Sequence, residues 1–313
     1  MKTFESLLDL VADQPTCRLS VAAAQDHTVL AAVRDAEERG LVEAALFGDR
    51  EGIRAAAERA AYRLREGQVV HEPDPVRAAR GAVALASSGE ADMVMKGYIH
   101  TDDFLRAILD KERGLRTGSI MSHVFIAESR QLDRLTFITD GAMNIAPDLE
   151  QKAAILLNAV HIARAFGIQR PKVAALAAVE LVNPLMPATL DAAALAEMSR
   201  RRQFSVPCEV DGPFALDNAV SELAARHKGI SGSVAGWADI LLVPSIEAGN
   251  VLAKALVYLG GCRQAGLLLG ARVPVVLTSR ADTAESKLLS IASAVFTINL
   301  GRDLWLKVGK VHY

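Results

Sequence analysis

Residues that could bind phosphate gather in one stretch of the chain, residues 92–123. An apolar start typical of a strand ends in Lys96-Gly97, and Thr101 then opens a predicted helix that carries two aspartates and Arg106. The first N–H groups of a helix lack intrahelical partners and the macrodipole is positive there, so such a start can bind an anion. With Lys96 and Arg106 nearby, the stretch predicts a phosphate site. The alternative is a charged helix N-terminus with cations on a solvated surface.

The elements that would position these residues alternate between strands and helices along most of the chain. Apolar runs such as residues 92–95, 135–139 and 239–243 are separated by amphipathic helical patterns. This alternation is typical of a parallel sheet covered on both faces. Ligands of such sheets bind beyond the carboxyl ends of the strands. Polar residues directly after a predicted strand are therefore the candidates for binding and catalysis.

Six sets of polar residues occupy that position. The sets are Lys96-Gly97; Thr139-Asp140 with Asn144; Glu180 with Asn183; Asp211-Gly212-Pro213 with Asp217; Ser245 with Glu247, Gly249 and Asn250; and Ser279-Arg280. Each also has a plainer interpretation, because Asp140 and Asp211 could cap helices, Asn250 could be a satisfied polar residue on a helix, and Gly212-Pro213 could be a turn.

Length and composition describe an ordinary globular protein. A chain of 313 residues predicts one large or two medium α/β domains, and the polar run 128–134 is interpreted as a crossing between them. A formal charge of −2 argues against non-specific nucleic-acid binding. The three cysteines, Cys17, Cys208 and Cys262, are too scattered for a disulfide framework or a zinc site. A reduced, cytoplasmic setting without membrane association is expected.

Several familiar motifs are absent from the sequence. It contains no G-x-x-x-x-G-K-[ST] loop for ATP, no G-x-G-x-x-G after a strand for a dinucleotide, and no G-x-S-x-G nucleophile elbow. The seven histidines lack the spacing of metal ligands. The residues therefore carry no recognisable signature of a metal site or of a dinucleotide site.

Taken together, these residues resemble the phosphate acetyltransferase and phosphate butyryltransferase family. The resemblance runs from about Glu43 to Phe296 and keeps the motifs in the order of the family. The motifs that carry it include MKGYIHTDDFLRAIL, FITDGAMNIAPDLEQK, VDGPFALDNAVS, AGWADILLVPSIEAGNVLAKAL and GARVPVVLTSRAD.

This resemblance implies a fold similar to isocitrate and isopropylmalate dehydrogenases, with two α/β domains around a central cleft. The expected domains are residues 1–131 with 278–313, and residues 132–277. The implied reaction is reversible: acyl-CoA and phosphate give acyl phosphate and CoA. Similar enzymes are usually homodimers and need no cofactor beyond these substrates.

The resemblance also implies roles for individual residues. Arg280 would hold the phosphate, Ser279 would donate to the developing oxyanion, and Arg106 would lie near the phosphate. The family's presumed base is an aspartate seven residues after the serine, where this chain has Ser286. Asp282 and Glu285 are local substitutes, and Asp282 is the catalytic carboxylate that we predict.

Lys96 is typical of the butyryltransferase-like branch, since acetyltransferases tend to have a small residue there. Substrate binding is predicted for strand-end residues in both domains: Lys96, Thr101, Arg106, Asp140, Asn144, Asp211, Glu247 and Asn250. Acyl chain length does not follow from the sequence, because one methylene changes binding by only about 1 to 3 kcal/mol.

Two other functions fit parts of the sequence. A non-catalytic protein that binds CoA or acyl phosphate would explain Ser286 at the position of the base. An NAD- and metal-dependent decarboxylating dehydrogenase would share the implied fold, but it needs a carboxylate cluster of the D-x-x-x-D type that the sequence lacks in a matching context.

Overall fold

A computed structural model describes residues 1–300 and 309–312 of the chain. The described residues form two compact units. One, here called the outer unit, comprises residues 4–119 and 265–300, and the central unit comprises residues 1–3, 120–264 and 309–312. The chain thus passes between units after Ser119 and after Gln264, whereas the sequence predicted crossings after residues 131 and 277. Residues 301–308 and 313 of the predicted segment 278–313 lie outside the described residues.

The outer unit is an α/β layer structure. Its sheet has the strand order β3-β2-β1-β4-β11-β10, in which β10 is antiparallel to β11 and the other strands are parallel. Its elements are α1 (Phe4–Ala12), β1 (Cys17–Ala22), α2 (His27–Glu38), β2 (Val42–Gly48), α3 (Arg50–Arg59), β3 (Val69–His71), α4 (Pro75–Ser87), β4 (Met93–Lys96), α5 (Thr101–Ile108), β10 (Arg263–Leu269, which starts in the central unit), β11 (Val275–Val276) and α11 (Ala284–Asn299).

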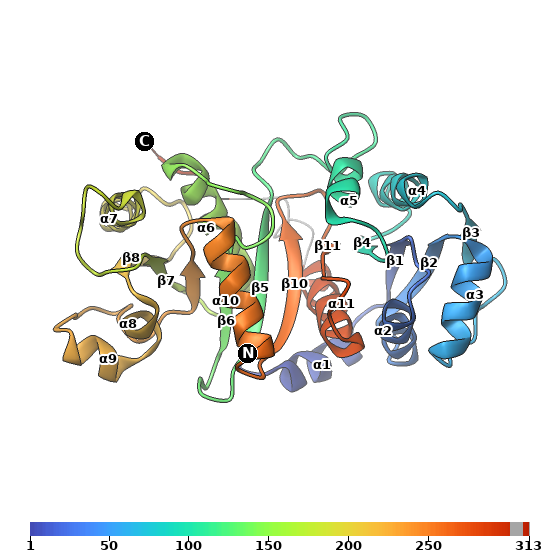
Figure 1. The fold of residues 1–313 in the computed structure, drawn as a ribbon, viewed down its shortest axis with the longest axis horizontal. Coiled ribbons are helices and arrows are strands. Elements are labelled where there is room, and N and C mark those ends of the chain that lie inside the picture. The colour runs from blue at the N-terminus through green and yellow to red at the C-terminus, as the bar shows by residue number, and fades with distance from the viewer. Residues whose placement is uncertain (301–308, 313) are drawn as a thin grey trace. The chain divides into compact units, whose positions relative to one another are not determined.

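Helices cover both faces of this sheet. In Figure 1, α4 and α5 lie on one face, and α2 and α11 lie together on the other, with α1 packed against α11. All four residues of β4 are buried, as expected for a strand between two helical layers. The N-terminal helix α1 buries Phe4, Leu7 and Val11, a spacing that places them on one face.

The central unit is also mixed α/β. Its strand order is β5-β6-β9-β7-β8, with β5 antiparallel to β6 and the remaining pairs parallel. Its elements are β5 (Ser122–Glu128), β6 (Leu135–Thr139), α6 (Leu149–Ala165), β7 (Lys172–Leu176), α7 (Pro187–Arg200), β8 (Glu209–Phe214), α8 (Leu216–Val220), α9 (Glu222–His227), β9 (Ile240–Leu242) and α10 (Ile246–Tyr258).

The two faces of this second sheet bury alternate residues of β6. Phe137 meets Phe166, at the end of α6, edge to face with ring centroids 5.6 Å apart. Ile138 belongs to the core cluster on the other face, to which α8, α9 and α10 contribute. The predicted α/β class is therefore confirmed for the described residues.

Two local predictions were wrong. The polar run 128–134 is not a crossing between units but the turn of a hairpin, because β5 and β6 pair antiparallel from Val124 with Thr139 to Glu128 with Leu135. The predicted turn at Asp211-Gly212-Pro213 lies inside β8, where Val210 and Asp211 pair with Val173 and Ala174 of β7. Among the described residues, no helix combines the length and apolar character needed to cross a bilayer.

Candidate active site

Three parallel strands of the outer unit end side by side at the candidate site. β4 pairs with β1 on one side and with β11 on the other, with Lys96 opposite Ala22 and Met95 opposite Val276. The segments that leave these carboxyl ends carry Asp26, Lys96 and Ser279-Arg280. The structure therefore brings Lys96 and the Ser-Arg pair of the sequence prediction to one edge of one sheet, where parallel α/β sheets bind ligands.

Residues 279–282 form a hydrogen-bonded turn between β11 and α11. The backbone N–H of Ser279 donates to the Asp282 carboxylate at 2.7 Å, and the Asp282 N–H donates to the Ser279 carbonyl at 3.2 Å. Ser279 Oγ accepts from the Ala281 N–H at 3.3 Å. A hydroxyl that accepts in this way can still donate its own proton. Ser279 and Arg280 are exposed, so both side chains can meet a ligand.

Arg280 lies against two side chains that follow β4. One terminal nitrogen of its guanidinium is 3.4 Å from Nδ1 of His100, and its central carbon is 5.9 Å from the centroid of the Tyr98 ring. A guanidinium has only donors, so Nδ1 must accept, and a neutral His100 then carries its proton on Nε2. His100 thus presents a second donor next to Arg280. No functional role was predicted for the histidines from the sequence.

Lys96 is a cation held out of water, with 2% of its surface exposed. Its Nζ donates to the Gly97 carbonyl at 3.4 Å. Burial, and after it the charges of Arg280 and Lys287, lower the pKa of Lys96 to about 8, against the opposing effect of the Asp282 and Asp26 carboxylates. A bound anion would therefore stabilise the charged form of Lys96.

Tight backbone packing fixes the end of β4. A Cβ on Gly97 would lie 2.3 Å from the Ala23 carbonyl oxygen and 2.5 Å from that of Ala22. Only glycine lets the chain leave Lys96 at this close approach.

Two buried polar atoms at the same sheet edge lack a partner among the described residues. One is Oγ1 of Thr278, the residue before Ser279, and the other is Oε1 of Gln25, which follows β1. Buried polar atoms are seldom unpaired without a reason, and a ligand or water is one.

The other predicted residues of the outer unit sit on α5. Thr101 is its first residue, and His100 at the N-cap makes no side-chain capping bond. Arg106 is paired with Asp103 on the same helix at 2.8 Å, and its side chain is 77% exposed. The structure thus gives Arg106 a surface partner of its own, as in the plainer interpretation, and a role at the phosphate stays a prediction.

In the central unit, three predicted binding residues fasten one loop after β6. The Asp140 carboxylate accepts from the N–H groups of Ala142 and Met143 at 2.9 and 3.0 Å, and from the Asn144 side chain at 2.6 Å. Asn250 of α10 donates to the Gly141 carbonyl at 3.1 Å. Asp140 is only 3% exposed. These contacts give Asp140, Asn144 and Asn250 a structural role in this state of the protein.

Asp211 and Glu247 are not drawn into that loop by any hydrogen bond among the described residues. Asp211 accepts from the Gly212 N–H at 2.9 Å within β8. Glu247 is exposed in the first turn of α10, where its own N–H and then the Ser245 hydroxyl lower the pKa of its carboxyl group. Direct contact of either residue with substrate stays a prediction.

Two further charged residues of this edge, Lys287 and Asp26, were not assigned to the site from the sequence. Asp26 accepts from Thr28 and from the Val29 N–H; burial opposes the charged form, but these hydrogen bonds leave its pKa lowered. A signal for Lys287 was present, because a lysine followed by Leu288-Leu289 and by Ile291 lies on the apolar face of its helix.

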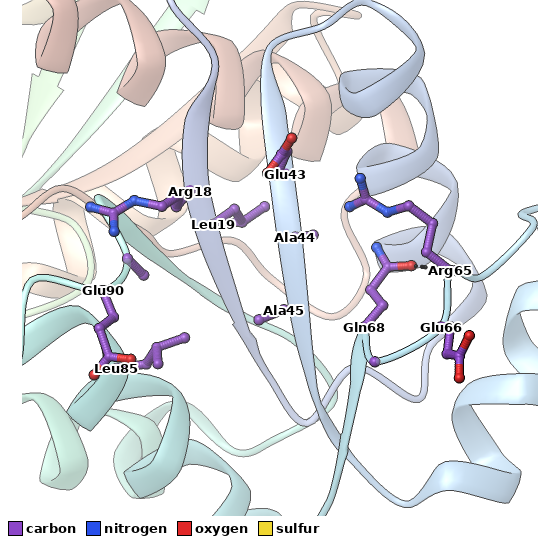
Figure 2. Close-up of a pocket in the computed structure, with 12 residues that line it drawn as sticks. Arg18, Leu19, Glu43, Ala44, Ala45, Arg65, Glu66, Gln68, Leu85 and Glu90 are labelled. Atoms are coloured by element: carbon purple, nitrogen blue, oxygen red, sulfur yellow. Dashed lines mark hydrogen bonds between the residues drawn. The ribbon is translucent and has the colours of Figure 1, made fainter.

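A separate pocket of about 430 Å³ lies at the opposite edge of the outer sheet, beside Leu19 and Ala44 near the amino ends of β1 and β2 (Figure 2). Its two arginines are paired with carboxylates: Arg18 with Asp92 at 2.9 Å and Arg65 with Glu37 at 2.7 Å. Since both of its cations already have carboxylate partners, it is a weaker candidate for a site that binds anionic substrates. The described residues contain no group of three or more His, Cys, Asp or Glu able to hold a metal ion.

Comparisons with known proteins agree with the resemblance seen in the sequence. The family model described as "Phosphate acetyl/butaryl transferase" matches residues 73–295. A phosphate butyryltransferase from Clostridium acetobutylicum is 50% identical over 94% of this chain and 97% of its own length. A phosphate acetyltransferase from Thermotoga maritima is 48% identical over 89% of this chain and 95% of its own.

Solved structures agree as well. The crystal structure of a branched-chain phosphotransacylase from Enterococcus faecalis superposes with a TM-score of 0.77 at 34% identity, covering 90% of this chain and 98% of that one. By both sequence and structure, the chain belongs to the phosphate acetyl/butyryl transferase family.

Proposed function

We propose that this chain is an acyltransferase that moves a short acyl group, acetyl or butyryl, reversibly between CoA and inorganic phosphate. The observation that carries the proposal is the cation cluster of Lys96 and Arg280 beside the Ser279 hydroxyl at the carboxyl edge of the outer sheet. Relatives named phosphate butyryltransferase and phosphate acetyltransferase, at 50% and 48% identity, support the reaction.

The reaction asks the site for three things. The CoA thiol attacks the carbonyl carbon of the acyl phosphate, the carbonyl oxygen becomes an oxyanion, and the phosphate then leaves with the electrons of the broken C–O bond. A fixed hydrogen-bond donor stabilises the oxyanion. A positive site stabilises the charge that gathers on the leaving phosphate.

The residues of the outer unit can supply the last two. Arg280 offers the planar fork that suits phosphate oxygens, with His100 beside it as a further donor. The Ser279 hydroxyl can still donate its proton to the oxyanion, because its Oγ only accepts, from the Ala281 N–H. In the opposite direction, the same cations hold the attacking phosphate. Asp282 stays the proposed acceptor of the thiol proton, as the sequence predicted.

Acyl-CoA assays test the proposal. Acetyl-CoA and butyryl-CoA should each release free thiol, measured with a thiol reagent, only when phosphate is present. Arg280→Ala should lower turnover about a hundredfold or more, because it removes the charged fork. Arg77→Ala is the matched control, since Arg77 is an exposed arginine paired with Glu72 on the same unit. Equal activity of wild type and Arg280→Ala would refute the site assignment.

The non-catalytic alternative has one observation in its favour. Ser286 stands where the family has its presumed base, and here its N–H and hydroxyl only bond to Thr283. Measurable CoA binding without thiol release from any short acyl-CoA would establish that alternative. Reduction of a nicotinamide cofactor by a hydroxy acid would instead favour a dehydrogenase.

The finer expectations of the sequence stay part of this proposal: a dehydrogenase-like arrangement with a cleft, a cytoplasmic setting, no cofactor beyond the substrates, and a homodimer. Large apolar side chains exposed on the central unit support the homodimer, among them Leu185 at 90%, Leu259 at 88% and Tyr258 at 64%. Sedimentation of the purified protein over a range of concentrations tests this, and a monomer throughout would refute it.

A further inference from the structure

Lys287 is a buried cation to which the reaction described above assigns no task. It lies in the first turns of α11, with 2% of its surface exposed. An ammonium group moved out of water costs several kcal/mol unless partners compensate it, and apolar residues often replace such groups with no loss of stability. A lysine kept at this position therefore calls for a specific reason.

Its hydrogen bonds point to that reason. Lys287 Nζ donates to the carbonyl oxygen of Ser279 at 3.3 Å and also to the carbonyl oxygen of Asp282. These are the first and last carbonyls of the turn that carries Ser279 and Arg280. The ammonium group thus ties together the two ends of the turn.

The same turn is closed a second time from its other side. The N–H of Ser279 donates to the Asp282 carboxylate at 2.7 Å. Both backbone polar groups of Ser279 are therefore held, the N–H by Asp282 and the carbonyl by Lys287. With its backbone fixed, Ser279 can aim its hydroxyl in only a few directions, and the chain enters Arg280 along one path.

From this geometry we propose that Lys287 is a positioning residue, which holds the Ser279–Asp282 turn so that Ser279 and Arg280 meet the phosphate and the oxyanion correctly. The inference rests on the proposed acyl transfer. Catalytic groups must be held to within about 0.5 Å of their productive positions, so a loosened turn loses rate without losing the fold.

Lys287 has an electrostatic effect as well. After burial and Arg280, its charge is a further cause that lowers the pKa of Lys96 to about 8. The carboxylates of Asp282 and Asp26 face Lys287 and act in the opposite direction on Lys96. Removal of the Lys287 charge should therefore raise the pKa of Lys96, a change that a merely structural role would not produce.

The test compares two replacements of similar length. Lys287→Met removes both the charge and the donor, whereas Lys287→Gln keeps an N–H donor for the carbonyls. Lys111→Met is the matched control, because Lys111 is an exposed lysine of the same unit. For each variant, thermal unfolding, kcat and KM for phosphate from thiol release, and phosphate affinity by calorimetry are measured, the last two between about pH 7 and pH 9.5.

We expect Lys287→Met to unfold at or above the wild-type temperature, yet to lose about tenfold to a hundredfold in kcat/KM for phosphate. Its pH dependence should shift upward by several tenths of a pH unit or more. Lys287→Gln should recover at least about tenfold of the lost activity, and Lys111→Met should match wild type.

The outcomes separate this inference from the proposed function. Lys287→Met with wild-type kinetics and an unshifted pH profile would overturn the inference. A stably folded Lys287→Gln with no more activity than Lys287→Met would also overturn it. If Lys287→Met fails to fold, the inference requires that the activity of Lys287→Gln stay within about tenfold of wild type. If wild type transfers no acyl group, the proposed function fails, and a fall in phosphate affinity in Lys287→Met alone would still support the positioning of Arg280.

Discussion

Phosphate affinity should depend on pH through Lys96. This ammonium group is 2% exposed, and burial together with Arg280 and Lys287 lowers its pKa to about 8 against the opposing charges of Asp282 and Asp26. A phosphate held by Arg280 would offset the cationic charge around Lys96 and raise that pKa. Phosphate binding should then take up a proton whenever Lys96 is neutral in the free protein.

The size of the effect follows from linkage. Below pH 8 Lys96 is already charged in the free protein, so its contribution to phosphate affinity does not change with pH. Above pH 8, the apparent affinity should fall by about a factor of ten per pH unit until the raised pKa of the complex is reached. At one unit above pH 8, about 0.9 proton should be taken up per phosphate bound, and about 0.5 at pH 8 itself.

Isothermal titration calorimetry in buffers of different ionisation enthalpy counts that proton directly. Lys96→Met is the reference, since it keeps an apolar side chain of similar length and removes the titrating group, leaving only the titration of phosphate itself. Wild-type affinity that is constant between about pH 7 and pH 9.5, or that falls with the same slope in Lys96→Met, would refute the argument.

Three further outcomes are expected. Asp140→Asn should lower the free energy of unfolding by about 2 to 4 kcal/mol in urea, because the amide keeps Oδ1 for the N–H groups of Ala142 and Met143 but puts an NH2 group where Oδ2 accepts from the backbone N–H and the side chain of Asn144; unchanged stability would contradict this. Lys96→Met should raise the free energy of unfolding by about 1 to 3 kcal/mol near pH 7. The pKa of Lys96 is lower in the folded than in the unfolded protein, so wild type should gain stability relative to Lys96→Met as the pH rises from about 8 to 10.5. A stability difference between the two proteins that does not change with pH would contradict this. Burial raises the pKa of the Cys17 and Cys208 thiols to about 11, so a thiol reagent near pH 8 should modify them at least about tenfold more slowly than free glutathione, and their serine variants should keep turnover because CoA supplies the reacting thiol.

The sequence predicted most of the elements, because the periodicity of buried residues is a local property. The fully buried run of β4 and the Asp26 cap of α2 are both legible in a single window. Strand β5 was missed, since Ser122 and His123 make its start look polar, although Ser122 is buried and accepts from Asn158 of α6. Without β5, the hairpin turn that follows it was misread as a crossing between domains.

The candidate site was predictable in part for the same reason. Strand ends identify positions, so the sequence alone is enough to select Lys96 and Ser279-Arg280. A position at a strand end does not reveal whether the polar side chain there already has hydrogen-bond partners within the protein. Asp140 and Asn144 follow β6 as the rule requires, but their bonds go to their own loop. That distinction depends on where backbone N–H groups point, which no local pattern records.

The charge balance of the turn explains why a lysine, rather than a second carboxylate, suits the helix that follows Ser279. An anionic residue beside Arg280 would compete with phosphate for the guanidinium and would draw the proton of Lys96 more tightly. A buried cation instead leaves Arg280 without a carboxylate partner on that helix and directs its own donors to backbone carbonyls. The positive charge that remains is directed to a ligand, and the positive N-terminus of α11 adds to it. In the proposed site, the stretch that begins at Asp92 would therefore supply one part of the phosphate contacts through Lys96 and His100, while Lys287 of α11 would hold the turn that precedes this helix.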